Sequence, residues 1–329
     1  MTPGWRTARM LLLVSGATLL AILVWRNDPE AILHSVRQLS WRVLIVIVFP
    51  FTLVNVLDTL GWRFAFRSDR VPFGALFSAR LAGEAFNLTT PTANVGGEAV
   101  KAWLIRHHVG LDESLPSVIV AKTTITIAQG LLLIVGLPCA WLLLPHDSPL
   151  LTIMLWLLVV EVLAVGGFIV FQVGGLLGRG GRALGRFVFL ERLAGGLGRL
   201  DSSLAIFYRR EPLRLVLSTL FHFLGWVASA LEVWVVLHLL GVEIPLTAAL
   251  LIEAFSTAVR FATFMVPAGI GALEGGHVAI FTALGLGGTT GLSFSIVRRI
   301  REATWIGVGF LALAAYRGVV GVPAAAGEH

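Results

Sequence analysis

The chain has 329 residues, of which 57% are hydrophobic and only 13% charged, and its formal net charge is +6. A soluble globular domain carries roughly 25% charged residues, so this composition excludes one and indicates a membrane protein with many helices. No polar stretch is longer than roughly 40 residues, which is too short for a separate catalytic or nucleic-acid-binding domain. The basic residues flank apolar segments, as at cytoplasmic membrane borders, and therefore do not indicate a nucleic-acid partner.

Long apolar segments recur along the whole chain, and each is close to the length that crosses a bilayer. We predict an all-α polytopic membrane protein with about six to eight transmembrane helices in a single integral membrane domain. The regular segments are 8–25, 43–62, 116–144, 149–172, 213–239 and 300–320, and less regular ones cover 74–105 and 246–286. The expected divisions of residues 1–329 are 1–42 (helix and loop), 43–172 (first repeat), 173–212 (basic linker) and 213–320 (second repeat).

The distribution of arginine predicts the orientation in the membrane. Seven arginines fall within 173–212, whereas 145–149 and 240–245 contain no Lys or Arg. The positive-inside rule therefore places 173–212 in the cytoplasm and the two turns outside. Counting back gives a cytoplasmic N-terminus, in a bacterial inner membrane, with the segment up to Trp25 read as an uncleaved first helix.

The linker has a helical pattern of its own. Leucines recur at 3-4-3-4 spacing from Leu190 to Leu204, with arginines on the other faces. This pattern predicts an amphipathic helix, which either lies on anionic headgroups or packs on the end of the bundle.

Two short stretches resemble each other. Asn87–Glu98 and Met265–Gly276 each contain a proline followed seven positions later by a glutamate, with glycines around them. A basic residue follows each proline by 31 positions, Lys122 in one copy and Arg298 in the other. Paired Gly/Pro-interrupted apolar segments in corresponding places of two halves point to the binding site of a transporter.

Neither stretch is expected to be an ordinary membrane helix. Proline removes a backbone donor, glycine weakens a helix, and irregular backbone at membrane depth persists only where protein or a polar cavity satisfies it. We therefore predict two re-entrant or broken-helix segments in inverted repeats, the first open to the cytoplasm and the second to the outside. This topology places Arg298, Arg299 and Arg301 toward the outside. Either these arginines face a polar cavity or the predicted topology is displaced there.

Ionisable residues within the apolar segments cluster at helical spacing. We expect contacts between Arg80 and Glu84, between Glu98 and Lys101, and between Arg298 and Glu302, with Glu253 and Arg260 sharing a face. Such residues are either structural ion pairs or a polar pathway with cations for an anionic headgroup and carboxylates for a hydroxyl, an amine or a proton. Asp58, Glu161 and Glu232 are more isolated, and hydrogen bonding between helices is the favoured interpretation. Neither a metal site nor a cofactor is predicted.

The motifs Asn87-x3-Pro91-x4-Gly96-Gly97-Glu98-x2-Lys101 and Pro267-Ala-Gly269-Ile-Gly271-x2-Glu274 resemble the lysylphosphatidylglycerol synthase transmembrane-domain family, also called flippase-like. In the best-understood members of that family the integral domain moves a lipid across the bilayer, and a separate soluble domain performs aminoacyl transfer. The resemblance implies the translocating part alone, because few residues follow Tyr316. Similar stand-alone proteins are associated with hopanoid and other envelope-lipid pathways. The resemblance also implies site roles for Asn87, Pro91, Gly97, Glu98, Lys101, Pro267, Gly269, Gly271 and Glu274. Many relatives have an acidic-basic pair in the next helix, where this chain has Ala121-Lys122.

These observations lead to a functional prediction. The chain is expected to translocate a polar or anionic lipid, or a lipid-linked intermediate, without acting as an enzyme. Membrane lipids are the expected partners, alongside envelope-lipid enzymes or a second copy of the chain. An intramembrane transferase and a scaffold for envelope-lipid enzymes are the alternatives. The candidate headgroup pathway comprises the motif residues named above together with Arg80, Glu84, Lys122, Arg260, Arg298 and Glu302.

Overall fold

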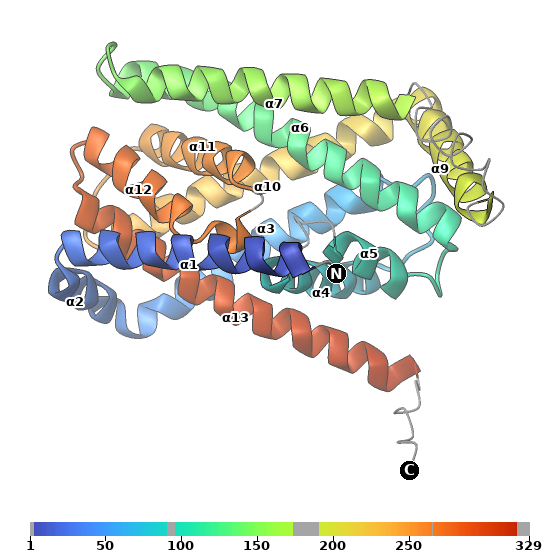
Figure 1. Ribbon diagram of the computed structural model, residues 1–329, viewed down its shortest axis with the longest axis horizontal. Coiled ribbons are helices and arrows are strands. Elements are labelled where there is room, and N and C mark those ends of the chain that lie inside the picture. Colours follow the sequence, from blue (N-terminus) through green and yellow to red (C-terminus); the bar gives the residue numbers. More distant parts are fainter. Residues whose placement is uncertain (1–2, 91–95, 174–190, 265, 321–329) are drawn as a thin grey trace.

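The computed structural model describes residues 3–90, 96–173, 191–264 and 266–320, and within these ranges it contains twelve α-helices and no strand. The first half comprises α1 (Pro3–Arg26), α2 (Pro29–Leu39), η1 (Ser40–Arg42), α3 (Val43–Phe64), α4 (Phe73–Thr89), α5 (Gly96–Leu104), α6 (Leu111–Leu143) and α7 (Pro149–Val173). The second comprises α9 (Glu191–Arg210), α10 (Pro212–Leu239), α11 (Leu246–Ala262), η3 (Pro267–Gly269), α12 (Ala272–Ala283) and α13 (Gly288–Val320). Most of the long helices run along the horizontal axis of Figure 1, and α9 lies across one end.

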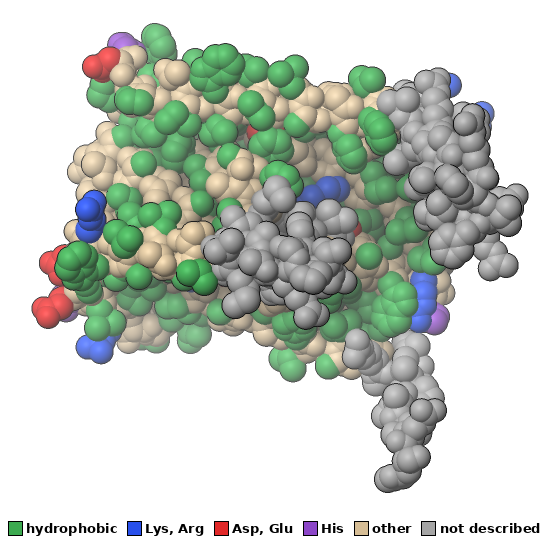
Figure 2. Space-filling view, in the orientation of Figure 1, with side chains coloured by type: hydrophobic (Ala, Val, Ile, Leu, Met, Phe, Trp, Pro, Cys, Tyr) green, Lys and Arg blue, Asp and Glu red, His purple; other side chains and the backbone are tan. Residues whose placement is uncertain are grey.

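Several of the long helices have the length and composition of membrane spans. Within the described residues, four segments meet both criteria: Ser40–Phe64, Leu111–Leu143, Pro149–Gln172 and Pro212–Leu239. On α7 the large side chains Val162, Leu163 and Val170 are 57%, 69% and 68% exposed, as lipid-facing residues are. Figure 2 shows hydrophobic side chains spread over the described part of the face in view. The prediction of an all-α polytopic membrane protein is confirmed.

Helices α3 and α10 cross closely and run antiparallel in the centre of the molecule. Ser218 on α10 donates a hydrogen bond to the carbonyl of Gly61 on α3, with an oxygen-oxygen distance of 2.8 Å. A Cβ on Gly61 would lie 2.6 Å from the ring of His222, and one on Gly225 would lie 2.6 Å from Oδ1 of Asp58. Small residues let helices approach closely in membranes, and here they join the two halves of the chain.

The two interrupted segments lie at opposite ends of the bundle. The α4–α5 hairpin lies toward the end that α9 crosses, which we call the α9 end, and the α11–α12 hairpin lies toward the other end (Figure 1). Helix α13 packs on α4 with Gly309 against Leu81 and Ala85, and α6 packs on α11 with Gly136 against Ala254. Each hairpin is therefore covered by the long helix of the other half, as inverted repeats require.

The described part of α9 packs on the bundle. Leu204 and Phe207 are buried in one hydrophobic cluster with Phe66 of the α3–α4 loop and Val118 of α6. Of the two alternatives for this helix, packing on the end of the bundle is the one observed. Residues 174–190 of the predicted linker lie outside the described residues.

Candidate functional site

Charged side chains of α3, α4, α5 and α6 meet inside the first half of the molecule. We call this set the first cluster, and it comprises Asp58, Arg80, Glu84, Glu98, Lys101 and Lys122. Lys101 lies at its centre and is only 8% exposed. Its Nζ is 2.6 Å from Oε1 of Glu84 on α4 and 3.2 Å from the carboxylate of Glu98 on its own helix. The predicted contact between Glu98 and Lys101 is confirmed, and the lysine also ties α5 to α4.

Arg80 makes a different contact from the one predicted. Its guanidinium donates hydrogen bonds to Oδ1 of Asn55 and to Oδ2 of Asp58, both on α3. The spacing of Arg80 and Glu84 favoured a pair within α4, but Glu84 pairs with Lys101 instead. Asp58 thus joins α3 to α4, in agreement with the prediction of a contact between helices.

Two glycines allow the α4–α5 hairpin to close tightly. A Cβ on Gly97 would lie 2.0 Å from the carbonyl oxygen of Gly83, and one on Gly83 would lie 2.8 Å from that of Gly97. Asn87 bridges the same site, because its Oδ1 accepts the backbone N–H of Gly97 at 2.7 Å and its Nδ2 lies 3.3 Å from Glu98. The amide thereby satisfies a free N–H at the start of α5, where no helical partner exists. Pro91 lies outside the described residues.

Part of the first cluster is accessible. A cavity of about 40 Å³ is lined by its charged residues together with Trp62 and His222. The side chains of Glu84 and Lys122 are 40% and 47% exposed, whereas that of Glu98 is only 15% exposed. Lys122 Nζ is 3.7 Å from Glu98, so the lysine extends from the buried carboxylate toward the opening. The open groups are thus one anion and one cation.

Eight charged side chains of α10, α11, α12 and α13 form a second cluster, which comprises Glu232, Glu253, Arg260, Glu274, Arg298, Arg299, Arg301 and Glu302. In its inner part, Arg298 is 2.6 Å from Glu253 and 3.5 Å from Glu232. Arg301 donates to the same Glu232, which is fully buried. These arginines lie in the interior of α13 and face acidic side chains of α10 and α11. Arg298 pairs with these two acids and not with Glu302.

The outer part of the second cluster holds the irregular backbone between α11 and α12. Arg299 lies 2.7 Å from Glu274 and 2.8 Å from Glu302, and it donates to the carbonyl of Ala268 at 2.8 Å. Ala268, Gly269 and Gly271 have φ angles of 51°, 60° and 81°. This conformation favours glycine, so the two glycines allow the turn.

Glu274 has a second role at the same turn. Its Oε2 accepts the backbone N–H of Gly271 at 2.7 Å, which caps the start of α12. The side chain is only 1% exposed, so both of its oxygens are used inside the protein. Arg260, which is 3.7 Å from Glu302, is the most open member of this cluster, with 36% of its side chain exposed.

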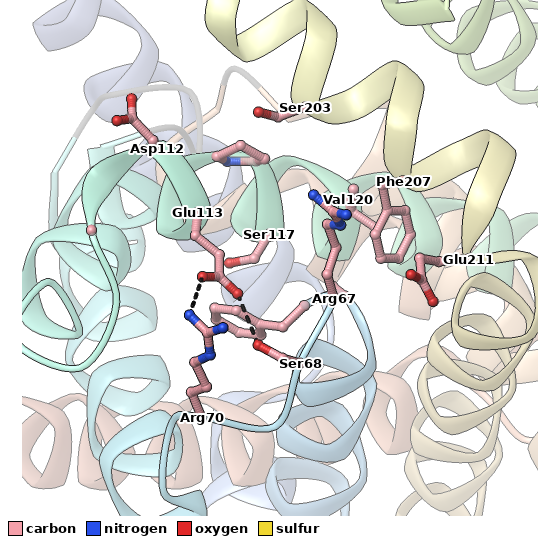
Figure 3. Close-up of a pocket in the computed structure, with 14 residues that line it drawn as sticks. Arg67, Ser68, Arg70, Asp112, Glu113, Ser117, Val120, Ser203, Phe207 and Glu211 are labelled. Carbon is pink, nitrogen blue, oxygen red and sulfur yellow. Dashed lines mark hydrogen bonds and ion pairs between the residues drawn. The ribbon is translucent and has the colours of Figure 1, made fainter.

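A larger cavity of about 570 Å³ opens at the α9 end (Figure 3). Its walls are the α3–α4 loop, the start of α6 and the end of α9. There Glu113 accepts a hydrogen bond of 3.3 Å from Ser68 and forms an ion pair with Arg70 at 4.0 Å. Ser117 lines this cavity and accepts a hydrogen bond of 3.2 Å from the indole of Trp62, which lines the smaller one. One side-chain contact therefore links the walls of the two cavities.

The structure gathers the predicted site residues into two groups, one per hairpin. The first group contains Arg80, Glu84, Asn87, Gly97, Glu98, Lys101 and Lys122, and the second contains Arg260, Gly269, Gly271, Glu274, Arg298 and Glu302. Pro267 begins the short turn η3, between the two helices of its hairpin. The sequence analysis did not select Arg299 and Arg301 for the site, although two further arginines beside Arg298 in an apolar segment were a usable signal.

Glu161 differs from the prediction made for it. A hydrogen bond to a neighbouring helix was expected, but neither carboxylate oxygen has a hydrogen-bond partner among the described residues. Within the same ranges no group of three or more His, Cys, Asp or Glu residues is placed to hold a metal ion.

Comparison with known proteins places these features in a family. The model of the lysylphosphatidylglycerol synthase TM region matches residues 10–310, so the chain belongs to that family. It is 23% identical over 312 residues to a UPF0104 membrane protein of Methanothermobacter thermautotrophicus, covering 88% of this chain and 90% of the relative. A UPF0104 membrane protein of Pyrococcus horikoshii is 23% identical over 316 residues, covering 89% and 92%. No solved structure matches the chain.

Proposed function

We propose that the protein moves a lipid with a polar headgroup between the leaflets of the inner membrane, in support of envelope-lipid biosynthesis. The observation that carries the proposal is the placement of charge. Two ionic clusters lie on hairpins at opposite ends of an otherwise apolar bundle, and each has open members, Glu84 and Lys122 in one and Arg260 in the other. Charged residues at membrane depth are unfavourable by about 2.5–3.5 kcal/mol each on insertion scales, and they commonly mark substrate pathways.

The headgroup would enter from the α9 end, which the arginine distribution predicts to be cytoplasmic. The larger cavity opens there, and the hydrogen bond between Trp62 and Ser117 stands between it and the first cluster. The acyl chains would remain in the bilayer while the headgroup passes the open charged groups.

The balance of charge favours a headgroup that replaces existing pairs. The first cluster has three acids and three bases, so its formal charge is 3 − 3 = 0. The second has four of each, which gives 4 − 4 = 0. An anionic group that approaches Lys122 would take the place of Glu98, and a protonated amine that approaches Glu84 would take the place of Lys101. This exchange keeps the buried charges paired, as a low-dielectric interior requires.

The test is a sidedness assay with fluorescent phosphatidylglycerol-type and phosphatidylcholine-type lipids in liposomes that contain the purified protein. We expect transfer of at least one probe by the native chain and a loss of about tenfold or more in Glu98→Gln, because a hydrogen bond to a charged group contributes about 1.5–3 kcal/mol. Glu243→Gln, in the exposed turn after α10, is the matched control and should transfer lipid normally. Normal transfer by Glu98→Gln would remove that residue from the pathway.

The same samples distinguish transport from catalysis. A translocator changes only the leaflet in which a lipid resides, whereas a transferase changes its mass. Mass spectrometry of the recovered lipids should therefore find them unaltered. A modified lipid that disappears in Glu98→Gln would establish an intramembrane enzyme instead.

The proposed orientation has an independent test. With Cys139 replaced, a single cysteine at Asp112 should react with an impermeant maleimide from the cytoplasm, and one at Asp147 should react from outside. Both positions are exposed, and they lie at the two ends of α6. Reaction of both from one face would contradict the orientation.

A further inference from the structure

Glu161 is a buried acid in the middle of a helix that mostly faces lipid. It lies midway along α7, between Pro149 and Val173, and is only 2% exposed. Both of its carboxylate oxygens are buried, and neither has a hydrogen-bond partner among the described residues. The side chain points at Gly130 of α6, where an added Cβ would lie 3.7 Å from the carboxyl carbon.

Among the described residues, the helices that pack on α7 provide no counter-charge to this carboxyl group. They are α6, α9 and α11, and their charged groups in the membrane part are already engaged. Lys122 of α6 pairs with Glu98, and on α11 Glu253 pairs with Arg298 and Arg260 with Glu302. On α9, Tyr208 donates to Gln172 of α7 at 2.6 Å, three turns from Glu161, and Arg199 pairs with Asp112 at the start of α6.

Four buried acids of the described α3, α10, α11 and α12 helices are in a different setting. Asp58, Glu232, Glu253 and Glu274 each lie within 4.0 Å of an arginine nitrogen. An ionised carboxylate without such a partner is strongly unfavourable in an apolar interior and takes up a proton instead. A purely structural role would need a donor for Glu161 to bind, and the described residues supply none.

We propose that Glu161 is a membrane-embedded proton-binding site, which couples proton movement to the lipid translocation proposed above. With the α6–α7 contact closed, the side chain is a neutral carboxylic acid. When the contact opens to water, the O–H bond breaks, the proton passes to water as hydronium, and the carboxylate remains. Reprotonation from the other side of the membrane returns the acid form and completes one cycle. The coupling to lipid transfer rests on the proposed function, whereas the protonation of Glu161 does not.

Protonation can be tested without any transport measurement. Dicyclohexylcarbodiimide is apolar and reacts with protonated carboxyl groups inside membranes: the acid oxygen adds to the central carbon, its proton moves to nitrogen, and nothing leaves. The full-length protein in liposomes is treated with the reagent over a range of pH, and the modified peptides are quantified by mass spectrometry. We expect labelling at Glu161 that falls about tenfold for each pH unit above its midpoint. Glu161→Gln removes the signal.

Internal controls come from the same chain. Glu232 is as buried as Glu161 but is paired with Arg301, and Glu243 lies in an exposed turn, so neither should react appreciably with the apolar reagent. Labelling of Glu161 that is absent, independent of pH or no greater than that of Glu232 overturns the proposal. The thermal stability of Glu161→Gln should equal or exceed that of the native chain, and a decrease of several degrees would reveal an ionic partner and overturn the proposal as well.

Coupling is then measured by lipid sidedness in liposomes with and without an imposed pH gradient. The native chain should transfer lipid several-fold faster with the gradient, and Glu161→Gln should lose this acceleration while it retains the rate seen without the gradient. Equal acceleration in both proteins contradicts the coupling. Absence of lipid transfer under every condition contradicts the proposed function, whereas the carbodiimide result still decides whether Glu161 binds a proton.

Discussion

The two hairpins occupy corresponding places in the two halves of the chain, but they distribute their charges differently. Counted from Pro91 and Pro267, the first half has Arg80, Glu84 and Lys101 where the second has Ser256, Arg260 and His277. The second half carries its additional cations on the long helix instead, at Arg299 and Arg301, where α6 has Thr123 and Ile125.

The difference has a structural counterpart. In the first half two of the three cations, Arg80 and Lys101, belong to the hairpin, and the contact is a close approach of Gly83 to Gly97. In the second half His277 bonds to Ser256 at 3.0 Å and to Ser295 at 2.7 Å, and α13 supplies three of the four cations from outside the hairpin. Both hairpins thus have a glutamate in the first turn of their short helix, Glu98 in α5 and Glu274 in α12. The base that pairs with it lies on the same helix in the first half and on α13 in the second.

The largest expected effect concerns the interior of the second cluster. Glu232→Gln leaves Arg298 and Arg301 with one acid fewer in a buried setting, and removal of one partner from a buried ion pair destabilises a protein by about 3–5 kcal/mol. Thermal unfolding in detergent, followed by tryptophan fluorescence, should show this loss together with low yield. Glu84→Gln, in the open part of the first cluster, should cost much less, and equal losses would contradict the division into a closed and an open cluster.

The second largest effect concerns the hairpin contact. Gly97→Ala places a methyl group against the carbonyl of Gly83 and should destabilise by roughly 3 kcal/mol, at the upper end of the range for overpacking. Gly275→Ala in α12 is the matched control, because its nearest neighbour outside the helix would be 3.9 Å away. Alanine should there be neutral or stabilise by up to about 1 kcal/mol, since it favours helix more than glycine does. The measurement is the same thermal unfolding, and similar outcomes for both variants would mean that the hairpins do not differ in packing.

A smaller and more selective effect is expected for the open cations. Lys122→Gln should slow transfer of a phosphatidylglycerol-type probe by about tenfold and that of a phosphatidylcholine-type probe by less, because it removes a charged donor to the phosphate region. Arg260→Gln makes the same change at the open side of the second cluster. The comparison shows which hairpin recognises the anionic group. Equal slowing of both probes would assign these cations to structural ion pairs.

The smallest effect lies at the α9 end, where the two halves join outside the membrane. Arg214 of α10 donates to Asp69 at 3.2 Å, and this hydrogen bond lowers the pKa of the Asp69 carboxyl. The lowered pKa means that the contact stabilises the fold above about pH 4 and is lost as the pH falls through the folded value. Because the pair is partly exposed, Asp69→Asn should cost less than about 1 kcal/mol at neutral pH, and this cost should shrink as the pH falls through the folded pKa of Asp69. A difference between the two proteins that grows on acidification would contradict this sign.

The sequence was sufficient to predict the class of fold and the positions of the two hairpins, because apolar length and proline-glycine interruptions act locally. It predicted the pair between Glu98 and Lys101, which lie one turn apart on α5, but not the pairs between helices. Spacing along one helix favoured Arg80 with Glu84, but Asp58 on a different helix lies closer, and the partner of a side chain in a bundle depends on which helices cross. The same limit applies to Glu161, because only the packing of α7 on its neighbours shows that no described donor reaches its carboxylate oxygens.

The arginines of α13 also constrain how the chain enters the membrane during synthesis. On insertion scales each arginine at the centre of a helix opposes partitioning by about 2.5–3.5 kcal/mol, and Arg298, Arg299 and Arg301 lie together on one segment. Their partners Glu232, Glu253 and Glu274 all belong to helices that are translated earlier. The order of translation therefore places three of the acids that neutralise these arginines in the chain before α13 is made.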